Sequence, residues 1–220
     1  RGATPPGTVR NVLRLSVPAG MQNLFMSAGF VALYRIAQLL GTRELAAANV
    51  LINLSLTCLL PAMGFGLAAA TLVGQALGRR APDEAKRWGW TTMFISCATL
   101  VVLGVVLAAP ARTWLGLLMK DVHAVELATA PLILLGIAQP FDSVGLVLMQ
   151  ALIGAGYVRV VTFWSIALQW ALFLPAAYII GVRYGAGLMG VWICLAIYRG
   201  LFSGVMALTF ARDNWVKTRI

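Results

Sequence analysis

The stretch GFGLAAATLVGQALGRRAPDEAKRWGW, Gly64 to Trp90, contains the end of one apolar segment, a short basic junction and the start of the next segment. Gly78 suits the C-terminus of a helix, and Pro82 suits the first turn of the following one. Trp88 and Trp90 come next, and tryptophan gathers where a bilayer meets water. The stretch therefore predicts two membrane-spanning helices joined by a tight, positively charged turn.

The rest of the chain has the same character, with 60% hydrophobic and 11% charged side chains among 220 residues and a mean hydropathy of +0.87. A water-soluble domain of this composition would expose more apolar surface than a single small core can hide. A helix needs about 20 mostly apolar residues to cross a bilayer. Six segments meet that requirement: Leu15–Leu40, Leu45–Leu77, Trp88–Ala109, Ala124–Ile153, Val158–Ile180 and Leu188–Ala211. The sequence predicts an all-α, polytopic protein of the inner (plasma) membrane, in contact with membrane lipids.

The chain has a net charge of +10, and its charged residues lie mostly between the apolar segments. We therefore interpret the charge as a signal of membrane topology and expect no nucleic acid partner. On one side of the predicted membrane lie Arg1, Arg10, Arg14, Arg79, Arg80, Lys86, Arg87, Arg159, Arg212, Lys217 and Arg219; on the other lie Arg43, Arg112, Lys120 and Arg183. The excess predicts that both termini are cytoplasmic. The three cysteines lie within apolar runs without metal-ligand spacing, so no structural metal or disulfide is expected.

Asp142 is the most informative residue, because it lies near the middle of the fourth predicted span. Its side chain is too short to reach the membrane surface, and removing a carboxyl group from water favours its neutral form. It is therefore a candidate for exchanging a proton or binding a cation. The alternative is a permanent structural pair with Arg35, Arg199 or nearby amides. Both arginines can also reach for the membrane surface.

Polar and kink-forming residues accompany this acid. Amides facing lipid would be unsatisfied, so we expect them to turn inward and converge on Asp142. Prolines within membrane helices weaken the local hydrogen bonding, and irregular helices of this kind hold the ion sites of transporters. The candidate substrate- or ion-binding residues are Asp142, Gln22, Met26, Asn49, Asn53, Gln139 and Gln150, and the candidate kink residues are Pro140 and Pro61.

Several motifs together resemble the multidrug and toxic-compound extrusion (MATE) family of transporters. They are LGTRELAAANVLINLSLTCLLPAMGFGLAAATLVGQALGRRAPDEAKR, then ALIGAGYVRV and GLMGVWICLAIYRG, and the likeness extends from about Leu13 to Phe210. Members of the family have twelve spans in two six-helix lobes and export organic cations and other amphiphiles against H⁺ or Na⁺. The resemblance implies that this chain is one lobe, more in keeping with the C-terminal half.

The resemblance also implies roles for single residues. Asp142 aligns with an acid that takes part in cation coupling in several members, whereas Met26 stands where some members have a glutamate, and Leu33 where the N-terminal lobe has an acid. Coupling by H⁺ is therefore favoured over a two-carboxylate Na⁺ site, although Na⁺ near Asp142 stays open. The expected organisation is a cytoplasmic lead-in or inter-lobe linker at residues 1–14, the lobe at 15–211 and a cytoplasmic tail at 212–220.

The resemblance implies efflux of small molecules by ion antiport, with no cofactor besides the coupling ion and with the missing lobe or a second copy as partner. One alternative is a flippase for lipids or lipid-linked oligosaccharides, which would be expected to carry more cationic residues in its cavity. Another is a lobe that packs without transporting. An intramembrane serine protease is disfavoured, because its serine needs a base within hydrogen-bond reach and the single histidine, His123, lies in the predicted loop before the fourth span.

Overall fold

The computed structural model describes residues 8–212 and 215, with side chains described from Gly20 onward. Its elements, all helical, are α1 (Thr8–Leu40), α2 (Thr42–Gly78), α3 (Pro82–Ala108), α4 (Ala111–Leu118), α5 (Val122–Gly154), α6 (Val158–Ala167), η1 (Leu168–Phe173), α7 (Leu174–Tyr178), η2 (Ile179–Arg183) and α8 (Gly187–Ala211). Six helical stretches in this part of the chain are long and apolar enough to span a membrane, and α6 to η2 form one of them. The predicted all-α fold with six spans is confirmed.

The boundaries differ from the predicted ones by a few residues. Helix α1 begins at Thr8 rather than Leu15, and α2 begins at Thr42 rather than Leu45. Residues 1–7 of the predicted lead-in, and 213–214 and 216–220 of the predicted tail, lie outside the described residues. Gly41 separates α1 from α2 with a φ of 145°, a backbone conformation that side chains with a Cβ rarely adopt. The predicted break at this glycine is therefore a sharp turn between consecutive spans.

The junction between α2 and α3 forms as its sequence predicts. Pro82 opens α3, and Asp83 and Glu84 lie in its first turn, where carboxylates interact favourably with the helix dipole. The Glu84 carboxylate accepts hydrogen bonds from Arg79 at 2.8 Å and from the Trp88 indole at 3.2 Å. These contacts hold the turn and place Trp88 at the end of the span.

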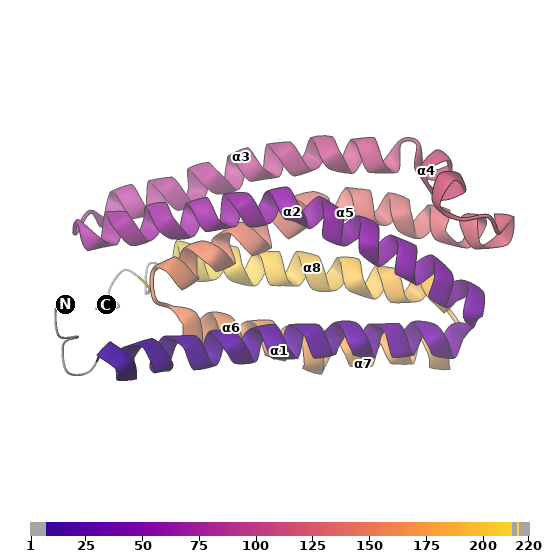
Figure 1. The fold of residues 1–220 in the computed structure, drawn as a ribbon, viewed down its shortest axis with the longest axis horizontal. Helices are drawn as coiled ribbons and strands as arrows, with labels where there is room; N and C mark the ends of the chain where they lie inside the picture. Colours follow the sequence, from indigo (N-terminus) through magenta and orange to yellow (C-terminus); the bar gives the residue numbers. More distant parts are fainter. Residues whose placement is uncertain (1–7, 213–214, 216–220) are drawn as a thin grey trace.

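Helices α2, α3 and α5 pack closely because small residues face one another. A Cβ on Gly154 of α5 would collide with the backbone of Ala70 on α2, and a Cβ on Gly136 would collide with the Gly104 carbonyl on α3. Figure 1 shows these three helices along one side of the lobe, with α1, α6 and α7 along the other and α8 between. The glycine- and alanine-rich part of Gly64–Gly78 thus brings α2 against α5.

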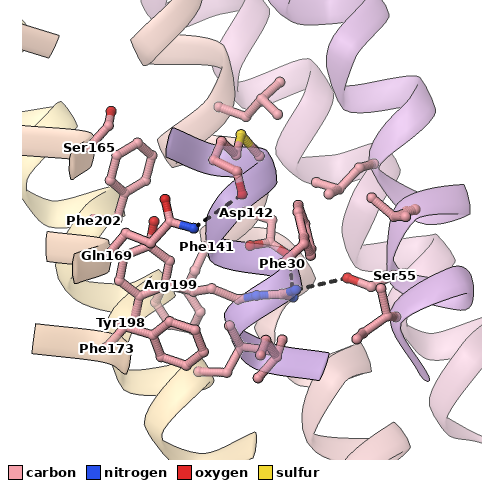
Figure 2. A pocket seen from close by; sticks show the side chains of 18 of the residues that line it. Phe30, Ser55, Phe141, Asp142, Ser165, Gln169, Phe173, Tyr198, Arg199 and Phe202 are labelled. Atoms are coloured by element: carbon pink, nitrogen blue, oxygen red, sulfur yellow. Dashed lines mark hydrogen bonds and ion pairs between the residues drawn. The ribbon is translucent and has the colours of Figure 1, made fainter. Parts of the chain in front are cut away.

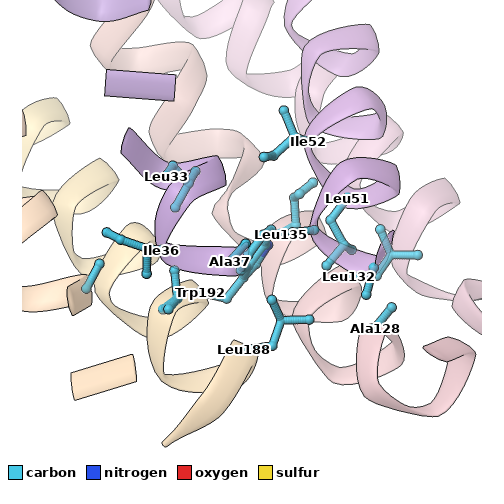
Figure 3. Close-up of a cluster of buried hydrophobic side chains, with 14 of the residues drawn as sticks. Leu33, Ile36, Ala37, Leu51, Ile52, Ala128, Leu132, Leu135, Leu188 and Trp192 are labelled. Carbon is cyan, nitrogen blue, oxygen red and sulfur yellow. The ribbon is translucent and has the colours of Figure 1, made fainter. Parts of the chain in front are cut away.

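The buried apolar side chains form two clusters at opposite ends of the helices. One contains Leu33, Leu51, Leu132, Leu188 and Trp192 (Figure 3). The other contains Val73, Leu148, Met206, Phe210 and Trp215. On α2, α5 and α8, the residues between the two clusters line a cavity. The hydrophobic packing therefore leaves room at mid-length of the lobe.

Prolines have different effects in different spans. Helices α2 and α5 continue past Pro61 and Pro140, and the predicted kinks at these residues stay predictions. The fifth span instead changes to the wider π-helical winding at η1, directly before Pro175 in α7. Proline lacks an N–H group and its ring crowds the preceding turn, which accounts for a widened turn at this place. The widened turn contains Gln169 and Trp170.

Candidate functional site

A cavity of about 150 Å³ lies at mid-length of the lobe. It is bounded by α1, α2, α5, α8 and the α6–η1 span, and its wall is mostly apolar and aromatic (Figure 2). The polar side chains among the described lining residues are Gln22, Ser55, Asp142, Ser165, Gln169, Tyr198 and Arg199. An apolar cavity with a few convergent polar groups is the usual form of a small-molecule site.

Asp142 lies in this cavity and forms an ion pair with Arg199. The Arg199 Nη1 lies 2.5 Å from the Asp142 Oδ2, and Nη2 donates a hydrogen bond of 2.8 Å to the Ser55 Oγ. The Asp142 side chain is only 10% exposed and the Arg199 side chain only 12%. The pair joins α5 to α8, and Ser55 extends the connection to α2 (Figure 2). Of the partners predicted for Asp142, Arg199 is the one that it contacts in the structure.

Aromatic rings pack beside the ion pair. The Tyr198 ring stacks on Phe173 with centroids 5.2 Å apart, and on Phe202 with centroids 6.0 Å apart. All three rings line the cavity together with Phe30 and Phe141. Such faces can contact flat apolar ligands and the faces of cations. Nothing in the sequence indicated that these five rings, which lie on four different spans, would meet.

Helix α1 contributes the predicted residues Gln22 and Met26. The Gln22 amide contacts the Met149 Sδ at 3.2 Å and the Ser165 Oγ at 3.4 Å. Gln169, in the widened turn η1, reaches the Met26 carbonyl at 3.5 Å. The Met26 side chain lines the cavity yet is 42% exposed, so it lies at an open edge. The structure therefore places Gln22 and Met26 with Asp142, as predicted, and adds Gln169.

Asn49 and Asn53 do not turn inward, and the prediction that they converge on Asp142 is wrong. Both are exposed on the outer face of α2. The Asn53 amide donates to the Asn49 side-chain oxygen at 2.6 Å and to its carbonyl at 2.9 Å, and Thr57 donates to the Asn53 carbonyl at 2.9 Å. Bonds between neighbouring turns pair part of these polar groups within their own helix, in place of a partner inside the lobe.

Gln139 and Gln150 also lie away from the cavity lining. Gln139 is fully buried toward α3 beside Gly104, and neither of its amide atoms has a hydrogen-bond partner among the described residues. Gln150 packs against Gly66 of α2. Both are near Asp142 on a helical wheel, but α5 is in contact with α2, α3 and α8, so these side chains face different neighbours. The prediction that they join Asp142 is therefore wrong.

The remaining arginine predicted as a partner, Arg35, is exposed and lies outside the cavity lining. Its Nη1 contacts the Gln38 side-chain oxygen at 3.4 Å. It behaves as a residue that reaches away from the apolar core. The polar cavity residues that were absent from the predicted binding set are Arg199, Ser55, Ser165, Gln169 and Tyr198. The position of Arg199 within the last predicted span was the sequence signal that could have identified it as a cavity residue.

In the described part of the chain there are six apolar spans, and five of them bound a cavity that holds an ion pair. This arrangement defines a polytopic membrane protein of the transporter class, with the charged groups where a membrane interior would surround them. The chain belongs to the MatE family of transporters, whose model matches residues 18–179. Members of this family are transporters and not enzymes.

Individual relatives agree with this assignment. The chain is 30% identical over 207 residues to the probable multidrug resistance protein NorM of Caulobacter vibrioides, covering 92% of this chain and 43% of that protein. It is 26% identical over 196 residues to the protein of the same name from Mannheimia succiniciproducens, covering 87% and 42%. A multidrug resistance MATE family transporter in an outward-facing conformation superposes with a TM-score of 0.90 at 20% identity, covering 99% of this chain and 50% of that one. The chain spans less than half the length of these curated relatives, and its fold is that of half a MATE transporter.

Proposed function

We propose that the chain is one lobe of a secondary active efflux transporter that exports organic cations or other amphiphilic drugs by H⁺ or Na⁺ antiport. The observation that carries the proposal is the Asp142–Arg199 pair in an otherwise apolar, aromatic cavity. The NorM relatives are probable multidrug resistance proteins, which supports multidrug efflux, whereas a flippase for lipid-linked cargo has no such support.

Alternating access would use the energetics of this pair. A carboxylate left alone in a closed, dry cavity costs several kcal/mol, whereas a paired or protonated one does not. Asp142 can take up a proton, but a guanidinium keeps its charge at all physiological pH values. Binding of a proton or cation at Asp142 would therefore weaken the link between α5 and α8 and change which packing of the helices is most stable.

The exposed polar residues on the outer face of α2 support the proposal that this lobe packs against a partner. Asn49, Asn53, Thr57, Thr71 and Gln75 are exposed along a helix that is long enough to cross the membrane. Amides are more stable against protein or water than against lipid tails. We propose that this face packs against a second lobe, either the rest of a longer protein or another copy. The other faces would contact lipid in the plasma membrane, with both helix ends at Thr8 and Ala211 on the cytoplasmic side.

Ethidium efflux from a drug-sensitive bacterial host tests the proposal. The protein is expressed from its native open reading frame, and membrane levels are matched by immunoblot. Asp142→Asn should reduce efflux by about tenfold or more, the effect expected when an interaction of about 1.4 kcal/mol or more is lost. Asp83→Asn, an exposed acid in the α2–α3 turn, is the matched control and should leave efflux unchanged.

Two outcomes would contradict the proposal in different ways. Absence of efflux by the wild type would overturn transport and favour a lobe that only packs against others. Retained efflux in Asp142→Asn, at equal membrane levels, would overturn the role of Asp142. Because Asp142→Asn leaves Arg199 unpaired, the double variant with Arg199→Gln shows whether lost efflux reflects chemistry or folding.

A further inference from the structure

The cavity holds one positive and one negative charge. Among the described residues that line it, Asp142 and Arg199 are the charged side chains, so its formal charge is zero. Figure 2 shows both pointing toward one another from different helices. A singly charged cation that enters this space and pairs with Asp142 would leave Arg199 without its counterion.

Arg199 is held at two points. Nη1 contacts Asp142 on α5 and Nη2 contacts Ser55 on α2, while the backbone of Arg199 belongs to α8. A guanidinium that is already held by Ser55 and by its own helix loses little further freedom when it pairs with a carboxylate. A tethered partner also competes with free ligands as though it were present at about millimolar concentration or above. Arg199 thus occupies the carboxylate with an advantage that a mobile cation lacks.

From this arrangement we infer that Arg199 is a specificity-determining residue, a tethered cation that competes with mobile cations for Asp142. This inference rests on the proposed function, since it concerns the same cavity. The consequence is that the wild-type cavity disfavours singly charged cations relative to ligands without net charge. A cation gains access to Asp142 only when Arg199 is displaced, and removal of Arg199 should convert the cavity into a better cation site.

Equilibrium dialysis of the purified protein in detergent tests the inference with two probes of similar shape, tetraphenylphosphonium and uncharged triphenylphosphine oxide. The dialysis is run at alkaline pH, where a proton does not neutralise the unpaired Asp142. Arg199→Gln should then bind the cation about tenfold more tightly than the wild type, because the buried carboxylate no longer has a tethered partner. Affinity for triphenylphosphine oxide should stay the same. Arg199→Lys keeps the positive charge and should show no gain.

Matched variants separate charge from space. The gain should vanish in Asp142→Asn/Arg199→Gln, which lacks the carboxylate. Arg35→Gln, the loss of an exposed arginine outside the cavity, should leave both affinities unchanged. An equal gain for both probes would mean that Arg199 merely fills volume, and would overturn the inference. So would an unchanged or lower cation affinity in Arg199→Gln.

A second variant keeps the test decisive if Arg199→Gln fails to fold. Ser55→Ala removes one of the two contacts of the guanidinium, and tetraphenylphosphonium affinity should then rise about threefold, in keeping with the net contribution of a single ordinary hydrogen bond. Unchanged affinity in Ser55→Ala would overturn the inference in that case. The binding and efflux experiments distinguish this inference from the proposed function. Higher cation affinity in Arg199→Gln without efflux by the wild type would uphold the competition for Asp142 and overturn the proposed transport. Efflux by the wild type without higher cation affinity in Arg199→Gln would uphold transport and overturn the competition.

Discussion

The Asp142 carboxylate on α5 and the Arg199 guanidinium on α8 are 57 residues apart in the sequence and form an ion pair within the cavity. Each side chain is largely enclosed by protein, so bulk water screens the pair only weakly. The two residues therefore depend on one another in a way that exposed ion pairs do not.

Removing the two partners of this pair should have unequal effects on stability. Asp142→Asn leaves a buried guanidinium that cannot lose its charge, so we expect it to destabilise the protein by about 3–5 kcal/mol. Arg199→Gln should cost less, because the carboxyl group can become neutral by taking up a proton. The double variant should recover most of the loss. Thermal unfolding of the purified variants in detergent measures this, and additive losses in the double variant would contradict the coupling.

The close contact between α3 and α5 should not tolerate a larger residue. A Cβ on Gly136 would meet the Gly104 carbonyl and the Ala108 side chain, so Gly136→Leu must push the helices apart. We expect a loss of about 2 kcal/mol or more. Gly204→Ala in α8 is the control, because no atom lies within 4 Å of its added Cβ. Size-exclusion profiles and melting temperatures give the measurement, and a Gly136→Leu protein as stable as the control would contradict the packing.

Gln139 should be replaceable by a nonpolar residue. Its amide is fully buried and has no hydrogen-bond partner in the part of the chain that the structure describes, and such a group costs about 1–3 kcal/mol. Gln139→Leu should therefore leave stability unchanged or raise it by about 1 kcal/mol. Ser143→Ala provides the contrast, because it removes the 2.8 Å hydrogen bond to Ser96 and should destabilise. Clear destabilisation of Gln139→Leu in the same thermal assay would mean that the amide has a bonding partner in solution.

The exposed face of α2 should be shielded from lipid in the complete protein. In a background with Cys58, Cys97 and Cys194 replaced, a nitroxide spin label attached at Asn53→Cys should collide rarely with oxygen, which concentrates among lipid tails. The same label at Phe94→Cys, a 65% exposed apolar position on α3, should collide with oxygen often. The physical reason is that amide groups avoid lipid tails, whereas Phe94 is suited to them. Greater oxygen accessibility at Asn53→Cys than at Phe94→Cys would contradict a second lobe on this face.

Local sequence signals were sufficient for the elements. Gly78 and Pro82 predicted where the second span ends and the third begins, because caps and turns depend on residues a few positions away. The position of Asp142 at mid-span followed from counting apolar residues alone. Gln22 and Met26 reach the cavity as predicted, although the reasoning that placed them there also placed Asn49 and Asn53 inside.

Apolar periodicity and composition by themselves determined that this chain forms six membrane helices with one acid at mid-depth, since every backbone group in a bilayer must be satisfied within its own helix. Only the tertiary structure decided that Arg199 and Ser55 meet that acid, that Asn49 and Asn53 face outward, and that Gln139 and Gln150 face neighbours other than the cavity. A helix fixes the direction of each side chain relative to its own axis. Its rotation against the neighbouring helices depends on contacts such as those of Gly136 with Gly104 and Gly154 with Ala70, which join residues far apart in the sequence.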